Sequence, residues 1–277
     1  MNIYPIQTGT VMIKEKQRAA QGSGAMRLFN VFFSRTWTPP LPIHAWVIEH
    51  PEGVIVVDTG ETSRTAQPGY FPRWHPYFQL AVRMQVAPEQ EIGPQLRARG
   101  IAPKDVKKVI LTHFHTDHAG GLSHFPESEI LVSEPDYRMA QRARAQLDGY
   151  LPQRWPEWFA PKSILFEPGA PGAFERSHPV TAAGDVLIVP TPGHTPAHVS
   201  VIVRQHGLNF FLAGDTSYTE QFLIAGQVDA VSPDENAARQ TMARILQFAR
   251  QQPTVYLPTH DPESSDRLKN SKTLQPA

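Results

Sequence analysis

The composition of this 277-residue chain sets the first limits on its function. Lys plus Arg (26) equals Asp plus Glu (26), so the chain has no excess positive charge of the kind that drives binding to nucleic acid. No apolar run reaches the roughly 18 residues of a membrane-spanning helix. The chain holds no Cys and 12 His, which leaves His and carboxylates as the ligands for any metal. We expect one domain, residues 1–277.

Short apolar runs rich in β-branched residues predict strands along the chain. In chain order they are Ala45–Ile48, Val54–Val57, Val109–Leu111, Glu129–Val132, Val186–Val189, Val199–Val203, Asn209–Leu212 and Thr254–Leu257. Helical patterns interrupt them at Glu89–Arg99 and Pro233–Gln251. For the second helix, Ser232, Pro233 and Glu235 are predicted at the N-cap, first-turn and capping-box positions. Strands mixed with helices indicate a layered α/β or α+β domain.

Two aromatic-rich stretches fit neither a regular strand nor a regular helix, and we predict ordered loops inserted near residues 61–88 and 148–162. Their centres are Tyr70–Phe78 (YFPRWHPYF) and Leu151–Phe159 (LPQRWPEWF). Three roles are compatible with this pattern: anchoring the loops to the core, an apolar wall beside a ligand pocket, or a homodimer interface.

The strongest chemical signal is the run THFHTDHAGG, residues 112–121, directly after a predicted strand. If the strand continues, His113 and His115 share one of its faces. A turn into a helix at Asp117 would then direct Asp117 and His118 towards a second point nearby. This spacing favours two metal ions over one.

Three further motifs place a His or an Asp at the end of a predicted strand, where open α/β sheets build their sites. They are TPGHTP with His194, AGD with Asp215, and PTHD with His260. With the first run they supply five His and two Asp, enough for two divalent cations. The other histidines lack such a placement, and we expect each to be structural or exposed: His44, His50, His75, His124, His178, His198 and His206.

Together, HFHTDHAGG, TPGHTPAH, AGDTSY and PTHD, preceded by VIVVDTG, resemble the metallo-β-lactamase superfamily from about residue 45 to residue 261. Within it, Asp215 followed by Tyr218 is most similar to the N-acyl homoserine lactonases, the quorum-quenching branch, in which a Tyr reaches the substrate carbonyl. The resemblance implies an α/β fold, the four-layered αβ/βα sandwich, with the site at one edge between two sheets. Thr116 and Ala197 depart from the pattern, because the branch often has a bulky apolar residue and a Gly there.

The resemblance also implies two divalent metal ions. The ligands of one ion would be His113, His115 and His194, and those of the other Asp117, His118 and His260. Asp215 would bridge the two ions. Asp58 would orient ligands from outside, or only form a turn with Thr59 and Gly60. Ligands of this type suit zinc, and Mn, Fe and Co accept the same set.

The implied enzyme is a metal-dependent lactonase, a carboxylic ester hydrolase that opens N-acyl homoserine lactones by attack of a metal-bridging hydroxide. Tyr218 would stabilise the oxyanion, and Asp117 would pass a proton to the ring oxygen. Hydrolysis of another lactone, such as a pyridine-fused one, or of a thioester in the manner of glyoxalase II, is the alternative. A metal-dependent scaffold without turnover would not need Tyr218.

The expected partner is a small-molecule lactone, with an apolar acyl tail if Tyr70–Phe78 forms part of a groove. We expect no nucleic acid and no membrane as partners, and the sequence leaves a homodimer open. The first residues, MNIYPIQTGTVMIKEK, lack the apolar core of a signal peptide, so the cytoplasm is the expected compartment.

Overall fold

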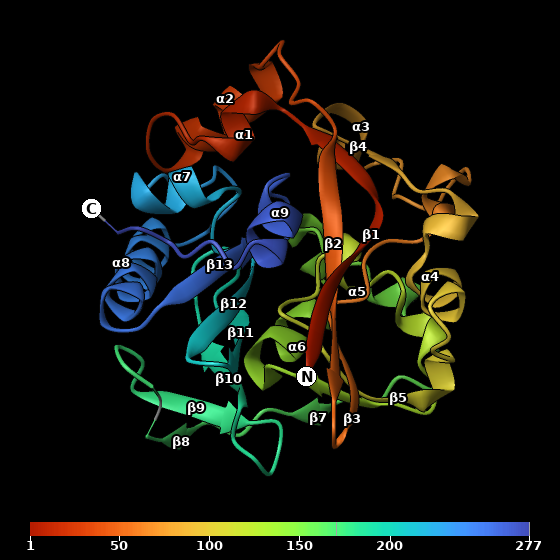
Figure 1. Ribbon diagram of the computed structural model, residues 1–277. Helices are drawn as coiled ribbons and strands as arrows, with labels where there is room; N and C mark the ends of the chain where they lie inside the picture. Colours follow the sequence, from red (N-terminus) through yellow and green to blue (C-terminus); the bar gives the residue numbers. More distant parts are fainter. Residues whose placement is uncertain (170, 277) are drawn as a thin grey trace.

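The computed structural model describes residues 1–169 and 171–276, and its strands form two sheets (Figure 1). The strands of the first sheet are β1 (Asn2–Ile13), β2 (Leu41–His50), β3 (Gly53–Val57), β4 (Val82–Gln85), β5 (Val106–Ile110), β6 (Glu129–Val132) and β7 (Lys162–Ser163). Those of the second sheet are β8 (Glu167–Pro168), β9 (Arg176–Pro179), β10 (Val186–Pro190), β11 (Val199–Gln205), β12 (Leu208–Gly214) and β13 (Thr254–Pro258). The strand orders are β4-β1-β2-β3-β5-β6-β7 and β13-β12-β11-β10-β9-β8.

Helices and short 3₁₀ turns connect these strands. The α-helices are α1 (Glu15–Arg18), α2 (Ala25–Phe33), α3 (Pro76–Leu80), α4 (Ile92–Ala98), α5 (Thr116–Ala119), α6 (Glu134–Ala140), α7 (Glu220–Ile224), α8 (Glu235–Gln251) and α9 (Ser264–Lys269). The 3₁₀ turns are η1 (Ser63–Ala66), η2 (Pro88–Gln90), η3 (Pro103–Asp105), η4 (Leu122–His124), η5 (Ala145–Asp148) and η6 (Pro152–Arg154). Within the described ranges, every helix is too short or too polar to cross a membrane.

The two sheets pack face to face over a shared apolar layer. Trp46 and Ile48 of β2 lie in this layer with apolar residues of β10 to β13. Ala45 and Val47 of the same strand pack on the opposite face against α4, because successive side chains of a strand alternate. The outer face of the second sheet packs against α8 through Phe248 and its neighbours. Figure 1 shows α4 and α8 on opposite sides of the molecule, and this order of layers confirms the predicted αβ/βα sandwich.

The predicted strands all overlap observed ones, but some predicted boundaries and one helix cap are wrong. The strand before the HFHTDH run ends at Ile110, so it does not carry His113 and His115. Pro88–Gln90 is a 3₁₀ turn, and α4 begins only at Ile92.

The N-cap of α8 is Asp234, not Ser232, since the Asp234 side chain accepts a hydrogen bond from Ala237 N at 2.9 Å. Ser232 instead donates its hydroxyl to Asp229 at 2.7 Å. The aromatic stretch Tyr70–Phe78 is not wholly a loop either, because α3 begins at Pro76 within it. A proline at the first position of a helix removes no intrahelical hydrogen bond.

Strand β1 was not predicted from the sequence, although it lies between β2 and β4 in the first sheet. Its apolar pattern is broken, because Gly9 has a φ of 117° and the pairing with β2 shifts between Gln7 and Thr10. A bulge of this kind moves the following side chains to the other face, which hides the alternation that identifies a strand.

Candidate metal centre

The seven predicted ligands lie together where four strands end, one strand in the first sheet and three in the second. They follow β5, β10, β12 and β13 in the chain and form three overlapping groups. The groups are His113, His115 and His194; His113, His118 and Asp215; and Asp117, His118 and His260. In each group the candidate ligand atoms lie within 4.8 Å of one another.

A tight loop after β5 brings four of these side chains to the centre. His115 is the N-cap of α5, and its carbonyl accepts hydrogen bonds from His118 N and Ala119 N, both at 3.1 Å. His113 and His115 therefore converge from a loop, whereas the sequence analysis placed them on one strand face. Asp117 and His118 lie in the helical turn, as that analysis expected.

Three imidazoles face one another through ring nitrogens. His115 Nδ1 lies 3.0 Å from His113 Nε2 and 3.0 Å from His194 Nε2. Burial lowers the pKa of His113 well below its usual range and that of His115 to about 4, so these rings are neutral. The Asp229 carboxylate beside the third ring instead raises the pKa of His194. Neutral imidazole nitrogens such as those of His113 and His115 are donors that a divalent cation fits.

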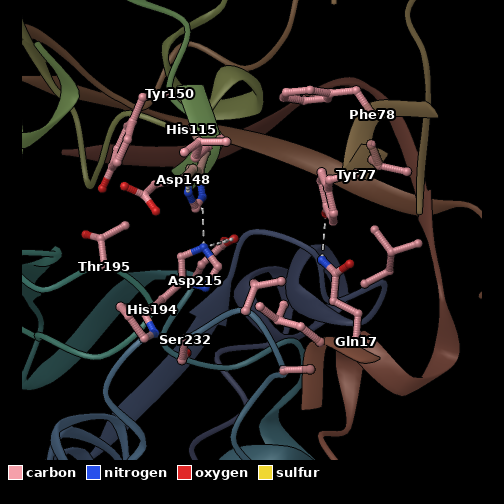
Figure 2. Close-up of a pocket in the computed structure, with 18 of the residues that line it drawn as sticks. Gln17, Tyr77, Phe78, His115, Asp148, Tyr150, His194, Thr195, Asp215 and Ser232 are labelled. Atoms are coloured by element: carbon pink, nitrogen blue, oxygen red, sulfur yellow. Dashed lines mark hydrogen bonds and ion pairs between the residues drawn. The ribbon is translucent and has the colours of Figure 1, made fainter. Parts of the chain in front are cut away.

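Asp215 lies beside His115 and His194 of this triad (Figure 2) and also contacts the second set of ligands. One carboxylate oxygen, Oδ1, is 3.4 Å from His118 Nε2. The other, Oδ2, is 3.5 Å from His194 Nε2 and 3.3 Å from His260 Nε2. Asp117 Oδ2 is in turn 3.4 Å from His260 Nε2. The carboxylate of Asp215 therefore contacts ligands of both sets.

Two atoms at the centre support a fit to cations. His118 Nε2 and Asp215 Oδ1 are buried and lie 3.4 Å apart, yet neither makes a hydrogen bond to the residues that the structure describes. An unpaired buried polar atom costs free energy unless a ligand satisfies it. The donor set therefore suits bound metal better than a site without metal.

Asp58 contacts the ring nitrogen of His118 that points away from the cluster, Nδ1. Its Oδ2 lies 2.8 Å from His118 Nδ1, and its carboxylate accepts hydrogen bonds from Thr112 N at 2.8 Å and Thr112 Oγ1 at 2.9 Å. Asp58 has a φ of 59°, an uncommon conformation outside glycine that these three contacts stabilise. It therefore both forms the turn after β3 and orients a candidate ligand, the two roles that the sequence left open.

Asp229 holds His194 in the same way, and the sequence analysis did not find it. Its Oδ2 lies 3.1 Å from His194 Nδ1. Its Oδ1 accepts hydrogen bonds from Val231 N at 2.8 Å and Ser232 N at 2.7 Å. The pattern Asp-x-x-Ser before a proline could have indicated a turn, but nothing in it points to a histidine 35 residues away.

His198 was predicted to be structural or exposed, and the structure shows a buried ring that supports Asp215. His198 Nε2 accepts a hydrogen bond from Asp215 N at 3.1 Å, and its Nδ1 lies 2.9 Å from Thr191 Oγ1. Gly214 has a φ of 56°, and a Cβ there would lie 2.5 Å from His198 Nε2. Glycine is therefore required at position 214 by this close approach.

A cavity of about 620 Å³ opens onto the candidate ligands. Tyr218, whose ring stacks on His260 with centroids 5.6 Å apart, lines it together with Asp117 and Thr116. Its walls are mostly apolar, and the larger apolar side chains include Val11, Ile13, Leu28, Phe32, Phe78, Val82, Met84, Met139, Leu147 and Val231. The cavity can hold a ligand with an apolar tail next to the cluster.

The two aromatic stretches have different roles. Tyr77 and Phe78 of the first line the cavity, whereas the Trp74 side chain is 58% exposed and does not. In the second stretch, Trp155 packs on Phe114 with ring centroids 4.9 Å apart and belongs to the core under the first sheet. The centre of the second stretch is therefore anchored to the core, whereas Asp148, Gly149 and Tyr150 at its start line the cavity together with the first stretch.

Comparisons with known proteins agree with this geometry. A model of the metallo-beta-lactamase superfamily matches residues 38–260. The N-acyl homoserine lactonase AttM of Agrobacterium fabrum is 26% identical over 98% of this chain and 97% of its own length. The probable metallo-hydrolase Rv2300c of Mycobacterium tuberculosis is 28% identical over 79% of this chain and 71% of its own length.

Solved structures show the same fold. A Bacillus thuringiensis AiiA variant with N-decanoyl-L-homoserine bound at its active site superposes with a TM-score of 0.76. It is 22% identical and covers 99% of this chain and 97% of its own. AidC, a dizinc quorum-quenching lactonase, has a TM-score of 0.66 at 15% identity, covering 95% of this chain and 88% of its own. At these identities the structures establish the fold alone.

Proposed function

The chain belongs to the metallo-beta-lactamase superfamily, and on that basis we propose that it is a metal-dependent lactonase acting on N-acyl homoserine lactones. The observation that carries the proposal is the cavity in which Tyr218, the ligand cluster and an apolar wall face one another. The names of the curated relatives from Agrobacterium fabrum and Bacillus sp. support the same substrate class.

We further propose that two divalent cations, preferably zinc, occupy the cluster. His113, His115 and His194 would hold one, Asp117, His118 and His260 the other, and Asp215 would bridge them. Two such cations acidify a shared water, polarise a carbonyl oxygen and stabilise a leaving alkoxide. Asp58 and Asp229 keep His118 and His194 oriented with Nε2 towards the cluster.

Tyr218 and Asp117 supply the remaining groups that ester hydrolysis needs. The Tyr218 hydroxyl donates a hydrogen bond to the lactone carbonyl oxygen as water oxygen bonds to the carbonyl carbon. Asp117 takes up the proton that the attacking water loses. When the ring C–O bond breaks, it passes this proton to the ring oxygen, which becomes the hydroxyl of the open-chain acid. Tyr218 is suited to this because burial keeps its pKa well above the usual range, so the hydroxyl retains its proton.

The cavity wall favours an apolar acyl tail over a charged one. Among the described residues that line it, Arg27 is the only Lys or Arg, and its guanidinium is already bound to the carbonyl of Asp229. A glutathione-like thioester would need free cations for its carboxylates. Each methylene buried against the wall gains up to ~0.8 kcal/mol, so two methylenes raise kcat/KM by roughly an order of magnitude.

A substrate panel read by proton release tests the proposal. It contains homoserine lactones with short and long acyl tails, a lactone without a tail, a pyridine-fused lactone and a glutathione thioester. We expect the long-tailed lactone to be the best substrate. Faster hydrolysis of the thioester or of the pyridine-fused lactone would contradict the assignment.

Variants of the wall locate the tail. Phe78→Ala should flatten the dependence on tail length and leave the lactone without a tail near the wild-type rate, because Phe78 lines the cavity. Trp74→Ala is the matched control, since Trp74 lies in the same stretch but faces solvent. If both variants keep the wild-type dependence on tail length, Phe78 is not part of the tail site.

A further inference from the structure

The segment before residue 38, where the family match begins, contributes to the cavity. The carbonyl of Gln17 in α1 accepts a hydrogen bond from Ala230 N at 2.8 Å, and Ala20 N donates to Val228 O at 3.2 Å. Figure 1 shows α1 and α2 at one end of the molecule, above α7. These bonds fasten the segment to the loop that contains Asp229, the residue that holds His194.

The Gln17 side chain joins two tyrosines inside the cavity. It is 2% exposed, and its amide Nε2 donates to Tyr77 Oη at 2.8 Å and to Tyr218 Oη at 3.1 Å. Figure 2 shows the amide nitrogen of Gln17 directed at Tyr77, across the cavity from His115 and His194. The amide nitrogen has two hydrogens, so both are used by these two bonds.

This arrangement determines where the tyrosine protons point. A phenol that receives a hydrogen bond on its oxygen keeps its own hydrogen free for another acceptor. A tyrosine hydroxyl ordinarily has a pKa of about 10, so at neutral pH both phenols keep that hydrogen. Tyr218 is held between Gln17 on one side and His260, on which its ring stacks, on the other.

We propose that Gln17 is a positioning residue for lactone hydrolysis: by donating to the oxygens of Tyr77 and Tyr218, it directs the Tyr218 hydrogen to the substrate carbonyl oxygen. The inference rests on the proposed function. Tyr77 takes the second amide hydrogen and so fixes the amide plane. Preorganised donors of this kind stabilise the transition state because they need no reorientation during the reaction.

Two substitutions at Gln17 separate orientation from packing. Gln17→Leu removes the donor. Gln17→Glu is nearly the same shape but presents oxygens that accept, which turns the phenol hydrogens away from the substrate. In both we expect kcat to fall about tenfold, a part of the cost of losing an entire oxyanion donor, with KM and metal content near wild type. Gln21→Leu is the matched control, because Gln21 is exposed on the same segment.

A double-substitution test shows whether Gln17 acts through Tyr218. Gln17→Leu should lower kcat in the wild-type background and have no further effect in Tyr218→Phe, because the hydrogen it directs is then missing. If Gln17→Glu keeps the wild-type kcat, or the effects of Gln17→Leu and Tyr218→Phe multiply, the residue does not orient Tyr218.

A spectroscopic readout is independent of turnover. With ¹³Cζ-labelled tyrosine, the resonances of Tyr77 and Tyr218 should shift together in Gln17→Leu and remain in place in Gln21→Leu. Unchanged resonances would overturn the inference. A wild type that hydrolyses no lactone would overturn the proposed function and the role of Gln17 with it, whereas hydrolysis that depends on Tyr218 but not on Gln17 would overturn this inference alone.

Discussion

Asp229→Asn should weaken metal binding by one set of ligands. Asp229 Oδ2 lies 3.1 Å from His194 Nδ1, while Oδ1 accepts hydrogen bonds from the backbone N–H groups of Val231 and Ser232. In the variant, the amide oxygen can keep the two backbone bonds, which leaves the amide NH₂ facing His194 Nδ1. If Nδ1 carries the hydrogen, two donors then oppose each other.

The repulsion between these two donors is removed only if His194 changes to the tautomer that cannot bind a cation through Nε2. The hydrogen would have to move to His194 Nε2, the atom that lies 3.0 Å from His115 Nδ1 and should bind the cation. A hydrogen bond to a charged group contributes about 1.5–3 kcal/mol. Its loss corresponds to roughly 10- to 150-fold weaker binding of the cation that we propose for His113, His115 and His194.

Competition with a chromophoric chelator measures this affinity for each zinc ion. We expect one ion to be released at a lower chelator concentration in Asp229→Asn and the other to be nearly unaffected. Ser232→Ala is the control, since it removes the 2.7 Å hydroxyl bond to Asp229 but leaves the contact with His194. Equal zinc affinities in wild type and Asp229→Asn would refute the tautomer argument.

Three further predictions follow from the same contacts. Asp215→Ala should lose metal from both sets and most activity, because two cations would repel without the carboxylate; retention of two ions by elemental analysis would contradict its bridging position. Phe248→Ala should lower the free energy of unfolding in urea by about 3–5 kcal/mol and leave kcat unchanged, since the ring is fully buried against the second sheet. A loss below about 1 kcal/mol would show that the surrounding core residues move to fill the cavity. Chelation should lower Tm as well as activity, and zinc should restore both, because a ligand bound only by the folded state stabilises it; a Tm insensitive to chelator would argue against buried metal.

The sequence alone predicted the cluster of candidate ligands and most strands. His113, His115, Asp117 and His118 are close in the chain, so a short loop and one helical turn suffice to bring them together. The motifs with His194, Asp215 and His260 each follow an apolar run that had to be a strand, and strand ends gather at the edges of sheets. Local pattern and strand topology were therefore enough to predict a cluster.

Tertiary structure decided which groups support that cluster. Gln17 reaches Tyr218, 201 residues away, and Asp58 reaches His118, 60 residues away. Neither contact leaves a local pattern, because both depend on how separate elements pack. The same holds for the aromatic stretches, which look alike in sequence. Phe78 faces a cavity and Trp155 packs into the core, since different neighbouring elements cover them.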